Sequence, residues 1–231
     1  MINLETPRKH RQLVDQARQL AMNMLRPISR KYDQAEHAYP KELDMLAALI
    51  DGVSESGATG GAGAAGVKRD DEQDKDGVRN GANLASVLSI AEMCWGDTGL
   101  LLAMPRQGLG NSAIASVADA EQQKRYEGIW AAMAITEPGT GSDSASITTT
   151  AVKDGDEYVL NGEKIFVTSG DRADAVVVWA TLDKSLGRAA IKSFVVRKDN
   201  PGMKVERLEH KLGIRASDTA VISFTDCRVP A

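Results

Sequence analysis

The stretch AVKDGDEYVLNGEKIFVTSG, residues 151–170, decides the fold class because its apolar and polar residues alternate with a period of two. This alternation is typical of strands that bury one face and expose the other. Two turn-forming dipeptides divide the stretch, Asp154-Gly155 and Asn161-Gly162. Asn-Gly between alternating segments is a strong hairpin signal, so we expect the strands to be separated at these positions.

Four more strand-like segments follow, separated by glycine or polar residues. They are ADAVVVWATL (173–182), IKSFVVRKD (191–199), MKVERLEH (203–210) and TAVISFTDCRV (219–229). No helical stretch lies between them, which excludes helical crossover connections and favours a mainly antiparallel sheet. We therefore predict a small β-barrel or sandwich for this half of the chain.

The preceding half shows apolar residues at three- and four-residue spacing, which is the period of amphipathic helices. The first such set is Leu13, Ala17, Leu20, Ala21, Met24 and Ile28. Thr6 is a suitable N-cap for this helix, with Pro7 at the first helical position. A second helix should begin at Pro40 and end at Gly52, because glycine is a common helix terminator.

A third helical segment runs from about Leu84 to Trp95, and Asp97 can cap the short apolar piece that follows. Asp119 and Gln122 have the spacing of a capping box. The chain is therefore predicted to be α+β. An N-terminal α-helical bundle, residues 1–128, precedes a mainly antiparallel β-barrel or sandwich domain, residues 129–231.

The hexapeptide GAGAAG, residues 61–66, fits the letters of a dinucleotide-binding fingerprint. That fingerprint has to leave a strand and enter a helix whose N-terminus holds a pyrophosphate. Here it follows a predicted helix and leads into the acidic segment VKRDDEQDKDGVRNG, residues 67–81, which would repel a phosphate. We expect residues 52–81 to form a mobile, solvated loop and reject the nucleotide interpretation.

Composition excludes several classes of function. The net charge of −4 provides no basic field for nucleic acid. No apolar run approaches the ~20 residues of a membrane span, and the charged N-terminus contains no signal-peptide core. We expect a cytoplasmic protein with no nucleic-acid partner and no membrane span.

Cysteine and histidine are sparse. Cys94 and Cys227 lie far apart without metal-ligand spacing, and we interpret them as buried or half-buried thiols in a reducing compartment. The three histidines are His10, His37 and His210, and we expect none of them to stand near a second plausible ligand. The sequence therefore predicts no metal site.

The decapeptide AITEPGTGSD, residues 134–143, lies where the helical half meets the strands. Pro138, Gly139 and Gly141 predict a tight turn with exposed backbone, surrounded by hydroxyl side chains. Free N–H groups and hydroxyls suit a phosphate or the polar edge of a heterocycle, although a plain polar turn has the same composition. The residues alone leave these two interpretations open.

At this motif the chain resembles the acyl-CoA dehydrogenase family, whose middle domain opens with T-E-P-G-x-G-S-D. The resemblance continues through DEYVLNGEKIFVTSG (156–170) and LGIRASDTAVISFTDCRVP (212–230), and includes EQQKRY (121–126) before the motif. It implies a helical domain, a β-barrel-like middle domain and a C-terminal helical bundle. It also implies FAD, an acyl-CoA thioester substrate, electron-transfer flavoprotein as acceptor, and a homo-oligomer (dimer or tetramer) or a hetero-oligomer.

The resemblance also implies roles for individual residues. The expected cofactor-binding residues are Met133, Ala134, Ile135, Thr136, Gly141, Ser142, Phe166, Val167 and Thr168. Among these, Ser142 should also approach the thioester substrate, and Thr168 should direct its hydroxyl at flavin N5. Glu137 and Asp143 are expected to fix the turn through bonds to backbone N–H groups, and Ser217-Asp218-Thr219 to form an architectural turn.

Two departures from the family pattern limit these expectations. Residues 52–77 form an acidic low-complexity segment where relatives help to build the mouth of the acyl pocket. The catalytic base, a glutamate in relatives, is expected beyond Ala231, so that residues 1–231 alone should be inactive. Acyl-chain type and oligomeric state are not predicted. Two alternatives stay open: a flavin monooxygenase or nitroalkane-type oxidase of the same fold, and a non-catalytic partner subunit of a hetero-oligomeric dehydrogenase.

Overall fold

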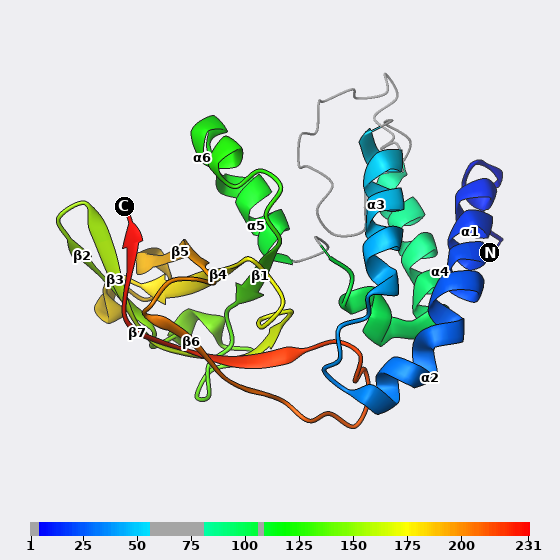
Figure 1. Cartoon of the computed structure of the whole chain (residues 1–231). Helices are drawn as coiled ribbons and strands as arrows, with labels where there is room; N and C mark the ends of the chain where they lie inside the picture. Colours follow the sequence, from blue (N-terminus) through cyan, green and yellow to red (C-terminus); the bar gives the residue numbers. More distant parts are fainter. Residues whose placement is uncertain (1–4, 56–80, 106–108) are drawn as a thin grey trace, which may run out of the picture.

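The computed structural model describes residues 5–55, 81–105 and 109–231 (Figure 1). The helices of residues 8–55 and 82–102 gather at one end of the molecule, whereas the sheet lies at the other end together with the helices of residues 109–125. The long last strand runs from the helical end to the C-terminus. The GAGAAG hexapeptide and most of the predicted acidic loop lie outside the described residues.

The first helical run is continuous through three segments, α1 (Arg8–Leu20), the π-helical η1 (Ala21–Leu25) and α2 (Arg26–Ala35). α1 begins one residue later than predicted, because Pro7 occupies the cap position rather than the first helical position. α3 (Glu42–Glu55) continues through Gly52, so the predicted stop there is wrong. One glycine costs a helix only about 1 kcal/mol, which flanking helix-forming residues offset.

α4 (Ala82–Leu102) packs against α1 and is interrupted at Asp97, whose backbone is extended. Its carboxylate accepts a hydrogen bond from the Leu100 N–H at 2.8 Å, which confirms the predicted cap. The predicted capping box is also present: Asp119 and Gln122 bond reciprocally at the start of α6 (Ala120–Arg125). The helical core contains Ala21, Leu25, Leu43, Leu46 and Leu100, all buried.

Seven strands form one curled sheet. They are β1 (Ala131–Ala134), β2 (Thr150–Asp154), β3 (Glu157–Thr168), β4 (Ala175–Thr181), β5 (Ile191–Arg197), β6 (Met203–Leu208) and β7 (Thr219–Pro230). Their order is β1-β4-β2-β3-β7-β6, with β5 paired to β4. Four pairings are antiparallel, whereas β4 runs parallel to both β1 and β2. The α+β class with a mainly antiparallel sheet is confirmed, and the sheet is a mixed half-barrel.

The two predicted turns in β2 and β3 have different outcomes. Asp154-Gly155 does end β2, and Gly155 has the positive φ of a tight hairpin. Asn161-Gly162 forms no turn, because β3 continues through it and stays paired to β7 across a register shift. Asn161 accepts a hydrogen bond from the Asp226 N–H at 2.9 Å. The extra residue of this irregularity lies on β7, between Phe224 and Cys227, where Asp226 has a φ of 45°.

α5 (Leu109–Val117) covers β1, and Gly110 permits the close approach because a Cβ there would lie 2.2 Å from the Ala132 carbonyl oxygen. Asn111 bonds to Ile129 and Ala131, which fixes the passage from helix to strand. Two short 3₁₀ segments, η2 (Ser144–Ser146) and η3 (Lys184–Ala190), complete the described elements. Among the described residues, no helix has the length and apolar character that crossing a membrane requires.

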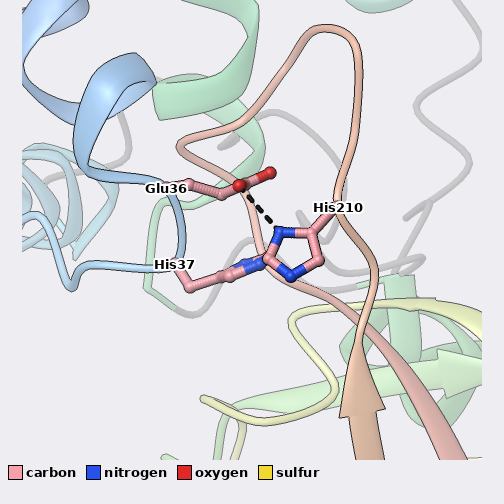
Figure 2. A group of neighbouring side chains, drawn as sticks. All are labelled: Glu36, His37 and His210. Atoms are coloured by element: carbon pink, nitrogen blue, oxygen red, sulfur yellow. Dashed lines mark hydrogen bonds and ion pairs between the residues drawn. The ribbon is translucent and has the colours of Figure 1, made fainter.

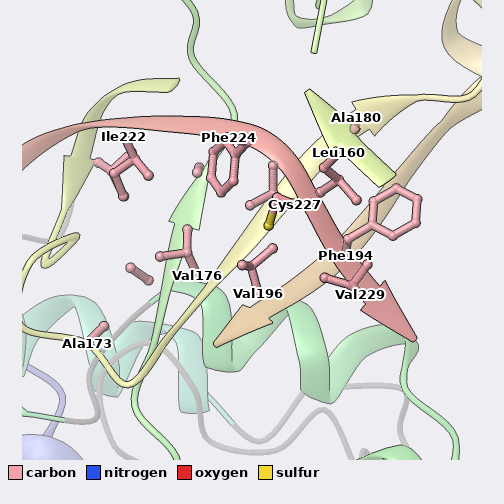
Figure 3. Close-up of a cluster of buried hydrophobic side chains, with 14 of the residues drawn as sticks. Leu160, Ala173, Val176, Ala180, Phe194, Val196, Ile222, Phe224, Cys227 and Val229 are labelled. Carbon is pink, nitrogen blue, oxygen red and sulfur yellow. The ribbon is translucent and has the colours of Figure 1, made fainter. Parts of the chain in front are cut away.

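The sheet core is shown in Figure 3. Its buried side chains include Leu160, Val176, Phe194, Val196, Ile222, Phe224, Cys227 and Val229. Cys94 is half-buried and Cys227 fully buried, and both are free thiols as expected. Burial raises the pKa of Cys227 to about 11, so this thiol is an apolar packing group rather than a nucleophile.

Candidate functional site

The Thr-Glu-Pro-Gly turn follows directly after β1. The main chains of Glu137 and Thr140 bond reciprocally, with N···O distances of 3.0 and 3.1 Å. Pro138 and Gly139 are exposed at its tip. The structure therefore contains the tight turn that the sequence predicted.

A buried ion pair anchors this turn. Glu137 and Lys164 are 3% and 0% exposed, and the lysine Nζ lies 2.8 Å from the carboxylate Oε1. Glu137 also accepts bonds from the N–H groups of Thr148 and Thr149, at 2.6 and 2.9 Å. Burial would raise the pKa of Glu137, but Lys164 and the threonine donors outweigh it and hold the pKa at about 2. Glu137 is thus a fixed, ionised structural carboxylate.

The same lysine ties β3 to the end of β1. Its Nζ donates to the Ile135 carbonyl at 3.0 Å, and the Ile165 N–H donates to the Thr136 carbonyl at 2.9 Å. Met133 and Ala134 lie within β1 and pair with β4. Residues 133–136 therefore lie beside residues 165–168, which brings the two groups of sequence-predicted cofactor residues together.

Phe166 has an unusual conformation. Its φ is 58°, and 60% of the residue is exposed, at a register shift between Lys164 and Val167. A positive φ at a bulky residue is rare, and bulges often re-aim a side chain next to a functional site. Val167 is buried and Thr168 exposed, so an aromatic ring and a hydroxyl project outward on either side of a core residue.

Several hydrogen-bonding groups around this surface have no intramolecular partner within the described residues. They are the hydroxyls of Thr136, Ser142 and Thr168, the N–H groups of Gly141 and Ser142, and the buried Thr140 hydroxyl. Buried polar groups are nearly always bonded, so the unpartnered Thr140 hydroxyl is consistent with a ligand or water at the turn. Asp143, by contrast, accepts a bond from the Ser146 hydroxyl at 2.5 Å, rather than the backbone bond predicted for it.

Ser142, Phe166 and Thr168 are exposed on this surface. Two hollows, of about 230 Å³ beside Thr98 and Arg215 and about 360 Å³ beside Tyr126 and Phe194, contain none of the sequence-predicted site residues.

Sequence patterns of two known domains match the chain: "Acyl-CoA dehydrogenase, N-terminal domain" over residues 7–133, and "Acyl-CoA dehydrogenase, middle domain" over residues 132–227. The chain belongs to the acyl-CoA dehydrogenase family. The resemblance inferred from the Thr-Glu-Pro-Gly motif and the strand motifs is thereby confirmed.

Similar members of the acyl-CoA dehydrogenase family include enzymes named for short acyl groups. The chain is 32% identical to the NADH-dependent acryloyl-CoA reductase of Anaerotignum propionicum, covering 97% of this chain and 55% of that protein. It is also 32% identical to the human mitochondrial short-chain specific acyl-CoA dehydrogenase, covering 99% and 53%. The chain therefore spans about half the length of these curated relatives.

A solved structure of the family has the same fold. Butyryl-CoA dehydrogenase from Megasphaera elsdenii superimposes with a TM-score of 0.79 at 26% identity, covering 100% of this chain and 59% of that one. The fold class predicted from the two hydrophobic periods agrees with this acyl-CoA dehydrogenase architecture.

Sequence reasoning missed two buried charged groups of this acyl-CoA dehydrogenase chain. Lys164 lies at an inward-facing position of β3. The alternation of apolar and polar residues in the sequence could have revealed that its side chain is buried. Arg172 lies 3.4 Å from Asp218, which is itself fully buried. Asp218 also accepts the Asp171 N–H at 3.0 Å, so the turn expected to be architectural contains a buried ion partner.

The prediction for the histidines is also corrected. His210 Nδ1 lies 2.9 Å from the carboxylate of Glu36, and the His37 ring lies beside the His210 ring (Figure 2). The expectation that no histidine stands near a second potential ligand is wrong, because the fold joins residues that are far apart in the sequence.

Proposed function

We propose that this chain contributes the flavin-binding part of an enzyme that introduces an α,β double bond into an acyl-CoA thioester with FAD as oxidant. The observation that supports it is the set of unpartnered hydroxyl and N–H groups on the Thr-Glu-Pro-Gly turn and on β3, together with the exposed Phe166 ring. Family membership supplies the chemical class, and the names of two relatives specify CoA thioesters with short acyl groups.

The residues present fit FAD. Phe166 offers a ring for stacking, while Thr136, Thr168 and the N–H groups of Gly141 and Ser142 offer donors for the polar edge and the phosphates. The main chains, rather than the side chains, would contribute at four further positions, because the side chains there are buried or half-buried. These positions are Met133, Ala134, Ile135 and Val167. The flavin would supply the hydride acceptor. In this proposal the chain orients it and stabilises charge on the ring through the threonine hydroxyls.

Three carboxylates near this surface are already engaged by other groups. Glu137 is paired and buried, Asp143 is bonded to Ser146, and Asp218 is buried with Arg172. We therefore propose that the base that removes the α-proton lies outside residues 1–231. Ser142, exposed and free, is the residue proposed to approach the thioester.

Further proposals follow from the family. We propose electron-transfer flavoprotein as acceptor, a homo- or hetero-oligomeric assembly, a cytoplasmic location and a role in fatty-acid catabolism. We also propose a domain division at residues 128 and 129. The last helix before it ends at Arg125, and the first strand after it begins at Ala131.

The test is anaerobic titration of the FAD-loaded product of the whole reading frame with butyryl-CoA. Bleaching of the flavin absorbance, with formation of crotonyl-CoA, is the expected result. A flavin that stays oxidised with butyryl-CoA and with longer and branched acyl-CoA thioesters would contradict the proposal. Dependence on externally supplied reduced flavin and oxygen would instead indicate the monooxygenase alternative.

A further inference from the structure

Three side chains with metal-binding atoms meet where the helical part joins the sheet. Glu36 and His37 lie in the turn between α2 and α3, and His210 lies just after β6. One ligand atom from each lies within 4.8 Å of the others. Figure 2 shows the two imidazole rings and the carboxylate converging, although the two segments are far apart in the sequence.

His37 provides an independent indication of a ligand. Both of its ring nitrogens are buried, and neither has a hydrogen-bond partner within the described residues. Leaving a buried polar atom unpaired costs free energy, so such atoms are rare in native structures unless a water or an ion satisfies them. The nearest ring is His210, with centroids 5.3 Å apart at 58°. Tilted rings at this distance leave room for an atom bound by both.

We propose that Glu36, His37 and His210 bind one divalent transition-metal ion of the zinc class. Two imidazoles and one carboxylate form a known zinc ligand set, with a water molecule in the fourth position. Zinc bonds of about 2.0–2.1 Å place neighbouring donors roughly 3.4 Å apart, closer than the 4.8 Å limit of the present cluster. The His210 side chain is 83% exposed, so it can rotate to close the difference.

The groups around Glu36 determine how tightly the proposed site would bind a metal ion. Its carboxylate accepts bonds from the Lys211 N–H at 3.1 Å and from the Arg215 guanidinium at 3.0 Å. These donors would orient the carboxylate as outer-shell partners. The positive charge of Arg215 opposes a bound cation, whereas the Lys211 ammonium is engaged by Ser217 and Thr219. We therefore expect micromolar affinity rather than that of a high-affinity structural zinc site.

A bound ion would join the helical part to the sheet. Arg172, from the segment before β4, already bridges the same boundary through bonds to the carbonyls of His37 and Ala38. The ion would add a second connection, from the turn after α2 to the segment after β6. Because it binds the folded state, it should raise the thermal unfolding midpoint.

The experiment is calorimetric titration of the whole chain, free of any affinity tag, with ZnCl₂, and absorbance titration with CoCl₂. All titrations are made in a His10→Gln variant, because this substitution removes the one histidine of the sequence that is not a proposed ligand. We expect one ion per chain, visible bands typical of four-coordinate cobalt, and an unfolding midpoint higher by roughly 5–10 °C at a free zinc concentration about 100 times the Kd.

His210→Asn is the deciding variant, because its side chain is exposed and its loss does not threaten folding. It should weaken zinc binding at least about tenfold and remove the thermal shift. His37→Ala should do the same where it folds. Absence of zinc binding at submillimolar concentration, or binding that His210→Asn leaves unchanged, would overturn the proposal.

Discussion

At the scale of single residues, the turn before the candidate site depends on one buried ion pair. Lys164 bonds to Glu137 and to the Ile135 carbonyl, so a single ammonium group fixes both a carboxylate and a main-chain segment. Two buried charges are expensive to desolvate, and removing one leaves the other without compensation. The pair therefore specifies the geometry of the turn more than it adds net stability.

Glu137→Gln should lower the free energy of unfolding by about 3–5 kcal/mol, because Lys164 would stay buried without its counter-ion. Adding Lys164→Met should restore most of the loss, since no buried charge then remains. Urea unfolding followed by circular dichroism measures both changes. A double variant as unstable as the single variant would contradict this account.

Acid should remove the contribution of the Glu137–Lys164 pair to the stability of the fold. The pKa of Glu137 is about 2 in the folded chain, below its ordinary value of 4.5, so its stabilisation is complete above about pH 4.5 and is lost as the pH falls toward 2. Unfolding free energies measured between pH 6 and pH 3 should fall more steeply for the wild type than for Glu137→Gln/Lys164→Met. Parallel curves would show that other carboxylates account for the acid sensitivity.

Thr168→Val should slow flavin reduction by acyl-CoA roughly 10- to 100-fold while leaving the fold intact. A hydrogen bond to a developing charge is worth about 1.5–3 kcal/mol. Anaerobic stopped-flow absorbance of the FAD-loaded enzyme measures the rate. Thr225→Val, at another exposed threonine of the sheet, is the matched control. Equal rates in the wild type and Thr168→Val would refute the proposed role of this hydroxyl.

At the scale of elements, β3 carries Lys164, which fixes the Thr-Glu-Pro-Gly turn, and also the exposed residues Phe166 and Thr168 of the candidate site. Its pairing with β7 shifts register twice: beside Gly162 the extra residue lies on β7, and at 165–166 it lies on β3 itself. Gly162 lies against Thr149 at the first shift, and Phe166, at the second, is exposed to solvent. Each bulge adds local twist, which curls the sheet into a half-barrel.

Gly162→Ala should destabilise the chain by about 1–3 kcal/mol. Gly162 has a φ of 153°, and a Cβ there would lie 2.5 Å from the Thr149 hydroxyl and 2.8 Å from its Cα. Gly213→Ala is the matched control, because a Cβ at Gly213 would meet nothing within 4 Å. Calorimetric unfolding midpoints decide the matter, and equal shifts in the two variants would contradict the steric argument.

At the scale of the whole molecule, the described residues present the candidate flavin surface on an open face. We expect residues 1–231, expressed alone and supplied with FAD, to give no detectable dehydrogenation of acyl-CoA thioesters with an artificial electron acceptor. The reason is that Glu137, Asp143 and Asp218 are all engaged by other groups of the described residues. Robust turnover by this fragment would show that the base lies within it.

The sequence by itself determined the order and type of most elements, the Asp97 and Asp119 caps, the hairpin at Gly155 and the family. These features depend on side-chain period, capping chemistry and turn preference, which act between neighbours in the chain. The predicted flavin residues came from resemblance, and the structure adds that residues 133–136 and 165–168 lie side by side.

Only the tertiary structure decided the features that join distant residues. Asn161-Gly162 has the composition of a turn, but pairing with β7 along the whole of β3 overrides that local preference. The Lys164–Glu137 pair and the His37–His210 contact likewise depend on burial and on chain segments that no short-range pattern relates. Local sequence determines periodicity, whereas the partner of a buried charge or an imidazole is determined by packing across the fold.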